Sequence, residues 1–333
     1  MRRSHLRYLI CPRCSGPLEL DAAGDDEGDV LETGKLSCVN CRAEFPVVRG
    51  VPRFVPVQNY ASSFGIEWTH HAKTQYDSFT GLTLTEDRFF GDTGWARGLP
   101  GEVVVEVGSG SGRFTEQAAR TGAMVISFDY SHAVDANYES NGGKENVLIA
   151  QADLYAMPLQ PGTADKLFCF GVLQHTPDAH AAFRALLPCL KPGGELVIDV
   201  YKKTFTLTVL ASKYYVRRFT RNLDPARLYR LTTRWVNAMW PLASVIRRIP
   251  RVGPAINWRL LVADYSIQGV NGQLLKEWAY LDTFDMLSPR YDSPQSIATV
   301  REWFANSGLV DWSVRYGGTG IVGRGKVARP DLP

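Results

Sequence analysis

The chain has 333 residues, a formal net charge of +3 and a hydrophobic content of 45%. This length suits two domains or one elaborated domain, and the small net charge gives no reason by itself to expect a nucleic-acid partner. No apolar run approaches the roughly 18 residues that a membrane span needs. The basic start at 1–5 leads into no signal-peptide core, so we expect a cytoplasmic protein without a membrane partner.

Four of the six cysteines form two C-x-x-C pairs near the N-terminus. Cys11 and Cys14 form the first pair, Cys38 and Cys41 form the second, and 23 residues separate them. Two such pairs can turn four thiolates toward one tetrahedral zinc ion. A redox dithiol or two disulfides could use the same cysteines, but a cytosolic location and Pro12 favour zinc. Four thiolates leave no open ligand position, so the zinc is expected only to hold a small domain together.

The residues around these cysteines predict a two-stranded ribbon over 1–57. An acidic, glycine-bearing stretch at 21–29 is typical of a solvated turn between two strands. After the second pair, "AEFPVVRGVPRFVP" predicts a short strand and an exit marked by prolines. The other two cysteines, Cys169 and Cys189, fall much later in the chain and are expected to be buried thiols.

The segment 58–100 is rich in aromatic residues and has few aliphatic stretches. It contains an adjacent pair of histidines, His70 and His71. Adjacent histidines are more commonly explained by a solvated helix than by a metal site. We therefore expect no zinc at this pair.

A run of valines at 103–107 is followed by glycines at alternate positions, Gly108, Gly110 and Gly112. The valines predict a buried parallel strand, and "RFTEQAAR" after the glycines predicts a helix. Glycines let backbone approach a ligand without interference from Cβ, so this is the layout of a nucleotide-type cofactor site. The dinucleotide fingerprint is incomplete because Arg113 replaces its third glycine, and a Walker A loop is absent.

Further predicted strands follow in order. "MVISFD" at 124–129 ends in Asp129, where a ribose-binding acid is expected, although Asp129 alone could also be a helix N-cap. A third strand at 147–150 precedes Asp153, and a fourth is predicted at 166–170. "LLPCLKPGGELVIDVY" then predicts a helix end, a Pro-Gly-Gly turn and a fifth strand.

These motifs over 103–201 resemble the class I S-adenosylmethionine (SAM)-dependent methyltransferases. Glu106 matches the acid of their first motif, although backbone amides of the turn could also hold it as a buried acid. The resemblance implies a Rossmann-like α/β fold with a seven-stranded sheet. It also implies that helices of 58–100 close over SAM as a lid, with Trp68, His70, His71, Tyr76 and Asp77 as the candidate lid residues. It places Asp153 beside the adenine amino group, and by its position Arg113 could reach the methionine carboxylate. The expected cofactor residues are Glu106, Gly108, Ser109, Gly110, Gly112, Arg113, Asp129, Tyr130, Ala152, Asp153, Leu154, Phe170 and Gly171.

Methyl transfer to a hydroxyl or a protonated amine requires removal of a proton. His175 follows the predicted fourth strand, where the family faces its acceptor, and histidine titrates near neutrality. It could instead order the turn with Thr176 and Asp178. Asp199 and Tyr201, at the end of the fifth strand, are the next candidates for catalysis.

The segment 201–285 is longer than a plain crossover and predicts a helical cap over the acceptor pocket. Its apolar residues at helical spacing are expected in the core of that cap: Leu228, Leu231, Trp235 and Met239. Its arginines could bind an anionic substrate or form a solvated face: Arg217, Arg218, Arg221, Arg227, Arg230 and Arg234. The sequence from 286 to 333 predicts a helix between Ser293 and Gly308 and a final strand hairpin that completes the core begun at 101–200.

The N-terminal ribbon resembles the small zinc-ribbon subunit that partners certain tRNA and release-factor methyltransferases, and the zinc domain of bacterial rRNA guanine-N1 methyltransferases. Two functions stay open: methylation of a small molecule on oxygen, nitrogen or carbon, and methylation of an RNA gripped by the ribbon. The ribbon is near-neutral with an acidic tip, and an N/D-P-P-Y motif is absent, so we favour the small molecule. The complete glycine turn and Asp129 argue against an inactive scaffold. The acceptor and the oligomeric state stay open.

Overall fold

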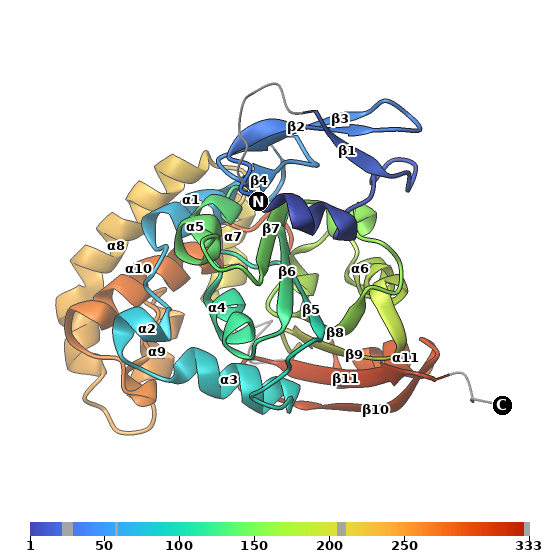
Figure 1. The fold of residues 1–333 in the computed structure, drawn as a ribbon. Coiled ribbons are helices and arrows are strands. Elements are labelled where there is room, and N and C mark those ends of the chain that lie inside the picture. Colours follow the sequence, from blue (N-terminus) through green and yellow to red (C-terminus); the bar gives the residue numbers. More distant parts are fainter. Residues whose placement is uncertain (22–28, 57–58, 205–210, 330–333) are drawn as a thin grey trace.

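A computed structural model describes residues 1–21, 29–56, 59–204 and 211–329. Most of the acidic turn predicted at 21–29 lies outside these residues. Seven strands form the central sheet in the order β10-β11-β9-β8-β5-β6-β7 (Figure 1). Their bounds are β5 Val103–Val107, β6 Met124–Asp129, β7 Val147–Gln151, β8 Ala164–Cys169, β9 Leu190–Val200, β10 Leu309–Tyr316 and β11 Ile321–Val327. The predicted Rossmann-like α/β sheet and its closing hairpin are confirmed.

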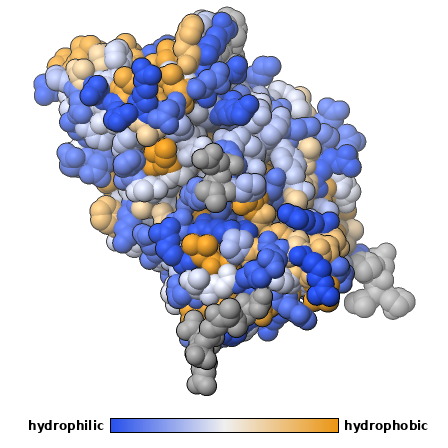
Figure 2. Space-filling model, turned by 90° about the horizontal axis from the view of Figure 1, so that it is seen from above, coloured by the Kyte–Doolittle hydropathy of each residue, from blue (hydrophilic) through white to orange (hydrophobic). Residues whose placement is uncertain are grey.

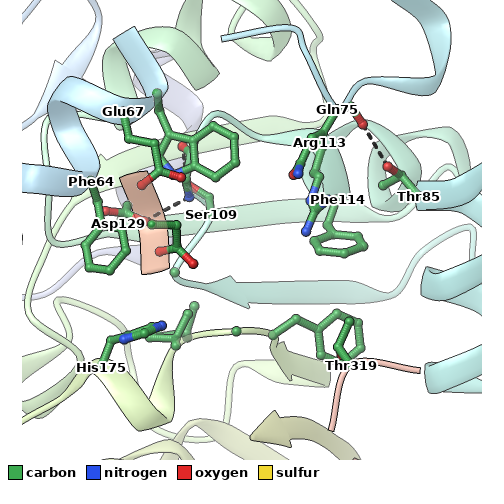
Figure 3. Close-up of a pocket in the computed structure, with 18 of the residues that line it drawn as sticks. Phe64, Glu67, Gln75, Thr85, Ser109, Arg113, Phe114, Asp129, His175 and Thr319 are labelled. Carbon is green, nitrogen blue, oxygen red and sulfur yellow. Dashed lines mark hydrogen bonds between the residues drawn. The ribbon is translucent and has the colours of Figure 1, made fainter. Parts of the chain in front are cut away.

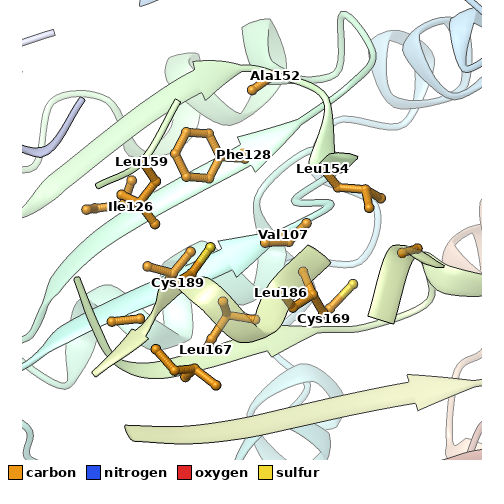
Figure 4. Packing of buried hydrophobic residues seen from close by; sticks show 14 of the residues in the cluster. Val107, Ile126, Phe128, Ala152, Leu154, Leu159, Leu167, Cys169, Leu186 and Cys189 are labelled. Atoms are coloured by element: carbon orange, nitrogen blue, oxygen red, sulfur yellow. The ribbon is translucent and has the colours of Figure 1, made fainter. Parts of the chain in front are cut away.

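Strands β5 to β9 pair in parallel, and β11 runs antiparallel to both of its neighbours. Alternate residues of β5 enter two different hydrophobic clusters: Val105 and Val107 face one, and Val104 faces the other. A parallel sheet covered on both faces needs continuous apolar strands, which explains the valine run. Figure 4 shows the first cluster, where Ile126 and Phe128 of β6 pack with residues of neighbouring elements.

Helices cover both faces of the sheet. On one face lie α3 (Leu84–Thr93), α4 (Arg113–Arg120) and α5 (Val134–Asn141). On the other face lie α6 (Ala179–Leu186) and α11 (Ile297–Ala305). Short 3-10 turns complete the connections at η2 (Leu154–Ala156), η3 (Leu173–His175) and η4 (Leu187–Cys189). Cys169 and Cys189 are buried, as predicted.

Two predicted boundaries are wrong. The Pro-Gly-Gly segment is no separate turn, because β9 continues through it with a register shift opposite Ala164 and with Gly193 at φ +81°. The last helix begins at Ile297 rather than at the Ser293-Pro294 pair. The side chain of Ser296 caps it by accepting a hydrogen bond from the Thr299 N–H at 3.0 Å.

The N-terminal ribbon is a four-stranded antiparallel sheet preceded by η1 (Arg3–Tyr8). This sheet has one strand more than the two-stranded ribbon and the short strand that were predicted. Its strands are β1 Leu18–Asp21, β2 Thr33–Cys38, β3 Glu44–Val48 and β4 Val51–Pro52. Beyond β4, Arg53 bridges in parallel to Gln151 of β7, and the Phe54 N–H donates to the Gln151 carbonyl at 2.9 Å. The ribbon therefore covers the edge of the central sheet, where an unpaired strand would otherwise be open (Figure 1).

The predicted lid and cap form one helical layer beside the sheet (Figure 1). The lid contains α1 (Ser62–His70) and α2 (Asp77–Thr80). The cap contains α7 (Ser212–Thr220), α8 (Pro225–Ile246), α9 (Gly253–Arg259), η6 (Ser266–Gln268) and α10 (Gly272–Leu287). Helix α10 contacts α7 and α8, and α1 contacts α8 and α10. No described helix is long and apolar enough to cross a bilayer.

The cap differs from expectation at three residues. Leu228 is buried as predicted, but Leu231 is 44% exposed and Trp235 is 43% exposed, so these two do not belong to a core. Arg217, expected on a solvated or ligand-binding face, is buried and pairs with Asp292. The apolar pattern of α8 serves two sides of the helix, and only one side is covered.

Candidate active site

A cavity of about 560 Å³ opens at the carboxyl ends of the parallel strands (Figure 3). The loops that follow β5, β6, β7, β8 and β9 supply one part of its wall, and α1, α3, η6 and α10 supply the rest. Open α/β sheets bind ligands at this end of their strands. Most residues predicted from the sequence line it: Gly108, Ser109, Gly110, Arg113, Asp129, Tyr130, Ala152, Asp153, Leu154, Phe170, Gly171, His175 and Tyr201.

The glycine loop leaves no space for larger side chains. At Gly108, with φ +84°, a Cβ would lie 2.0 Å from Cγ2 of Val172. At Gly110, with φ +54°, a Cβ would lie 2.9 Å from Nε1 of Trp68. Gly112 at φ +93° precedes α4 and packs against Asn137, outside the cavity lining. The loop thus needs glycine for both conformation and close approach.

Asp129 ties the glycine loop to the end of β6. Its Oδ2 accepts a hydrogen bond from the Gly110 N–H at 2.8 Å, and its Oδ1 accepts from the N–H and the hydroxyl of Ser131, both at 2.7 Å. Helix α5 begins later, at Val134, so Asp129 is not its N-cap. Burial raises the pKa of this carboxyl, and the Ser131 and Gly110 donors oppose that shift. Since each carboxylate oxygen has two lone pairs, Oδ2 keeps one acceptor position for a ligand hydroxyl.

Glu106 lies beneath the glycine loop rather than in the cavity wall. It is fully buried and accepts hydrogen bonds from the hydroxyls of Thr115 and Ser127, the latter at 2.9 Å. The expectation of backbone amide partners was wrong, because both donors are side-chain hydroxyls. Since Glu106 does not line the cavity, it is not placed for direct contact with a cofactor. Burial raises the pKa of Glu106 to about 8, although both hydroxyl donors oppose the shift.

Asp199, expected to act on the acceptor, lies behind the wall. Its Oδ1 accepts from the Gly171 N–H at 2.5 Å, and its Oδ2 accepts from Arg88 at 2.5 Å and Thr319 at 2.8 Å. Gly171, Arg88 and Thr319 all line the cavity. Because Asp199 is buried and is not part of the cavity lining, it is a positioning residue, which corrects the prediction of a catalytic role.

Arg113 reaches the cavity with a free guanidinium. Its Cζ lies 4.6 Å from the centre of the Phe114 ring, and within the described ranges no carboxylate forms an ion pair with it. Burial lowers its pKa to about 10, and the positive charge of Arg88 adds to this shift. Arg113 therefore stays charged at neutral pH and can receive an anionic group.

His175 faces the cavity with a defined tautomer. Its Nδ1 lies 3.0 Å from the backbone carbonyl of Tyr291, and since a carbonyl only accepts, Nδ1 carries the proton. In the neutral imidazole, Nε2 is then the acceptor. The His175 ring meets Tyr201 edge-on and also packs against Phe64. Figure 3 shows His175 on one side of the cavity, with Glu67 and Arg113 on the other.

Five carboxyl groups in the wall were missed from the sequence: Glu67 of α1, Asp87 and Asp92 of α3, and Asp282 and Asp285 of α10. Burial raises the pKa of Asp282 to about 8 and raises that of Glu67 well above its usual range, and the mutual repulsion of the acids adds to both shifts. One buried oxygen each of Glu67 and Asp282 has no hydrogen-bond partner. The i, i+3 spacing of Asp282 and Asp285 was the one signal in the sequence, since it puts both on one helix face.

Only Trp68 of the five lid candidates lines the cavity. Tyr76 supports the site from behind by donating to the Ser111 carbonyl at 2.5 Å, and Asp77 accepts from the Thr85 N–H at 3.0 Å. His71 is buried, with Nε2 2.9 Å from the Tyr229 hydroxyl, so a solvated helix was the wrong explanation for it. His70 is exposed and stacks on the same tyrosine ring.

The four paired cysteines converge at one point of the ribbon. All four Sγ atoms lie within 4.8 Å of one another, with 3.6 Å between Cys11 and Cys41 and 3.4 Å between Cys14 and Cys38. Tetrahedral zinc with Zn–S bonds of about 2.3 Å separates its sulfur ligands by about 3.8 Å. The cluster therefore has the donor set and the dimensions of a zinc site.

Comparison with known proteins identifies two segments. Residues 105–198 match the family described as methyltransferase domain, and residues 2–50 match the family described as Trm112p-like protein. The chain is 34% identical over 131 residues to the ubiquinone biosynthesis O-methyltransferase of Xanthomonas campestris, a match covering 36% of this chain and 52% of the relative. The enzyme of the same name from Methylococcus capsulatus is 29% identical over 129 residues, covering 37% and 54%.

Among solved structures, an S-adenosylmethionine-dependent methyltransferase from Mesorhizobium loti resembles this chain with a TM-score of 0.29 and 22% identity, covering 33% of this chain and 50% of that one. The chain spans about half the length of the curated relatives that it matches. The two family matches show a Trm112p-like domain followed along the chain by a methyltransferase domain.

Proposed function

We propose that this chain, with its methyltransferase domain and Trm112p-like domain, is a class I SAM-dependent methyltransferase of a small-molecule acceptor. The observation that carries the proposal is the cavity at the carboxyl ends of the strands, where the glycine loop, Asp129 and Arg113 lie across from His175. The wall fits SAM because Gly108 and Gly110 form a cradle that any Cβ would fill.

The residues that would hold SAM follow from their free groups. Oδ2 of Asp129 would accept a hydrogen bond from a ribose hydroxyl. The unpaired guanidinium of Arg113 would receive the carboxylate. Asp153, whose Oδ1 accepts from the Tyr155 N–H at 2.9 Å, and Leu154 would border the adenine. When bound, SAM supplies an activated methyl group on a sulfonium, so no metal is needed for its activation.

The chain's own contribution to the reaction would be positioning and proton removal. Tyr291 fixes the His175 ring with Nε2 available to accept the proton of an acceptor hydroxyl or ammonium. Asp199 would keep the opposite wall in place through Gly171, Arg88 and Thr319. The relatives are named O-methyltransferases, so a hydroxyl group is the first acceptor to test.

The acceptor end of the cavity favours a small molecule over RNA. Glu67, Asp282 and Asp285 line it, and carboxyl groups, whether protonated or charged, supply no positive charge for the phosphates that a nucleic acid would bring. Aromatic side chains of the lid and cap, including Trp68, Tyr265 and Trp278, close over the same space. This arrangement suits a compact acceptor held between α1 and α10.

For the ribbon we propose one structural zinc ion held by Cys11, Cys14, Cys38 and Cys41. Because all four ligands would be thiolates, the ion offers no open position for substrate. Metal analysis of the purified chain should give one equivalent of zinc. Full zinc content in a Cys38→Ser, Cys41→Ser variant would place the ligands elsewhere.

Turnover with methyl-labelled SAM tests the function directly. The wild-type chain should be incubated with a small-metabolite extract and, separately, with an RNA pool, using Asp129→Ala as the inactive control. We expect label in the metabolite fraction only. Incorporation into RNA would contradict the small-molecule proposal and would give the ribbon a role in binding substrate.

A further inference from the structure

The outer side of the cap concentrates positive charge. The stretch 212–259 contains eleven lysine and arginine residues and one acid, Asp224. It therefore carries a formal net charge of +10, although the whole chain carries only +3, so that the rest carries −7. Charge of this density on one stretch indicates an anionic partner.

Most of these cations are free. Lys213 and Arg217 pair with Asp292, and Arg247 pairs with Asp264. Eight arginines are exposed and, within the described ranges, form no ion pair with a carboxylate: Arg218, Arg221, Arg227, Arg230, Arg234, Arg248, Arg251 and Arg259. Holding eight unpaired arginines in so short a stretch costs repulsion that a bound anionic surface would relieve.

An apolar seam runs between these arginines. On α8 it consists of exposed residues spaced by four and three: Leu231, Trp235, Ala238, Leu242 and Val245. Ile249 and Val252, in the turn after α8, and Ile256 of α9 are also exposed. Leu242 is 49% exposed and Val245 is 61% exposed. A spacing that averages 3.5 residues keeps such side chains on one side of a helix.

The seam is separate from the side of α8 that packs inward. Leu228, Val236 and Ala243 on that inner side are almost completely buried. In Figure 2, hydrophobic and hydrophilic residues interleave at the edge of the view where α8 lies, on the left. An exposed apolar surface of this extent marks an interaction site.

The exposed arginines near the seam distinguish among the partners that could bind it. A second copy of the chain would bring two faces of like charge together. A nucleic acid would meet the arginines but would gain nothing from Leu242, Val245 or Ile249. A bilayer with anionic lipids satisfies both sets, since arginines bind the headgroups while the seam enters the acyl boundary.

We propose that the cap face, formed by the exposed residues of 212–259, binds the surface of membranes that contain anionic lipids. None of its residues lines the cavity, so this inference stands whether or not the proposed function is correct. It revises the expectation of no membrane partner, which rested only on the absence of a spanning segment.

Vesicle co-sedimentation of the full chain tests the proposal without any variant. We expect binding to vesicles of phosphatidylcholine mixed with phosphatidylglycerol, and little binding to phosphatidylcholine alone. Added salt should weaken it, because part of the attraction is screened. Equal binding to both kinds of vesicle, or binding to neither, would overturn the proposal.

Two variants locate the surface. Arg230→Glu with Arg234→Glu should weaken vesicle binding at least about tenfold, since each cation near an anionic bilayer is worth about 1 kcal/mol. Leu242→Ser with Val245→Ser should weaken it as well. The matched control is Arg184→Glu with Arg301→Glu, which makes the same charge change at exposed arginines of α6 and α11.

Other outcomes would assign the face to another partner. A control variant that loses as much vesicle binding as Arg230→Glu with Arg234→Glu would show a general charge effect. A dimer in analytical ultracentrifugation that the seam variant dissociates would assign the seam to a second copy. Tight RNA binding at physiological salt, lost with Arg230 and Arg234, would assign the face to nucleic acid.

Discussion

The carboxylate of Asp129 combines two roles, of which the sequence indicated only the binding of a ligand. It anchors the glycine loop through Gly110 and still presents a free acceptor position to the cavity. Other residues divide such tasks. Arg113 reaches the cavity and is free for a ligand, while Asp199 lies buried behind the wall and holds Gly171 and Thr319 in place. At this scale, function follows from which polar atoms reach the cavity with a free bonding position.

Replacing Asp129 by alanine should weaken SAM binding at least about tenfold, or about 1.4 kcal/mol. The variant loses the expected ribose contact and also the anchor of Gly110. Calorimetric titration with SAM measures the change. Asp178→Ala, which removes the N-cap of α6 outside the cavity lining, is the matched control and should bind SAM normally. Unchanged affinity in Asp129→Ala would remove this residue from the site.

Replacing His175 by glutamine should lower kcat about a hundredfold or more, because a general base contributes that much to proton transfer. The affinity for SAM should stay within about twofold, since binding of SAM does not use the imidazole. Steady-state kinetics and calorimetry separate the two effects. A variant that retains its kcat would leave His175 with the role of ordering the loop.

The acids of the cap should make stability depend on pH. Burial raises the pKa of Asp282 to about 8 from 3.8, so the folded state holds a proton that the unfolded state releases. The stabilisation is complete below about pH 4 and is lost as pH rises toward 8. Asp282→Asn should therefore melt at least about 2 °C higher than wild type at pH 8, and the difference should shrink at pH 5. Equal melting curves at both pH values would contradict this.

At the scale of elements, the two exceptional segments are the glycine loop and α8. The loop has a conformation that suits only glycine and neighbours that exclude a Cβ. Helix α8 has an apolar inner side and an apolar outer seam, and this explains why helical spacing alone predicted a buried position for Leu231 and Trp235. Periodicity identifies a helix, but it does not say which sides are covered.

Gly108→Ala should weaken SAM binding at least about tenfold, since its φ of +84° and the 2.0 Å approach to Val172 force the loop to move. Gly101→Ala is the matched control. Gly101 has φ +80° and open space around its Cβ position, and it lies outside the cavity lining. The control should lose stability without losing affinity. Similar affinities in both variants would show that backbone strain, and not the closed cradle, matters here.

At the scale of the whole molecule, ribbon and core are one packed unit. Leu9, Leu36 and Phe45 of the ribbon share a hydrophobic cluster with Leu148 and Leu159 of the core. Arg53 pairs with Asp135 at 2.6 Å across the same boundary. The ribbon also pairs with Gln151, directly before the cavity residues Ala152 and Asp153.

Loss of zinc should consequently destabilise the whole chain. Cys38→Ser with Cys41→Ser, or a strong chelator, should lower the melting temperature by about 5 °C or more in a single transition. Differential scanning calorimetry measures this, and added zinc should restore the chelated wild type but not the variant. Two separate transitions, with the higher one unchanged, would mean that the ribbon and the core unfold independently.

The sequence by itself determined the parts of this protein that local chemistry controls. Strand composition, the alternate glycines of the turn and the spacing within each C-x-x-C pair depend on neighbours a few residues away, and the elements predicted from them are present. Tertiary structure decided the rest. Glu67 meets Asp282 and Asp285, Asp199 is engaged by Arg88, and the seam of α8 stays uncovered. These contacts join segments distant in sequence, because the burial of a side chain depends on which other elements pack against it.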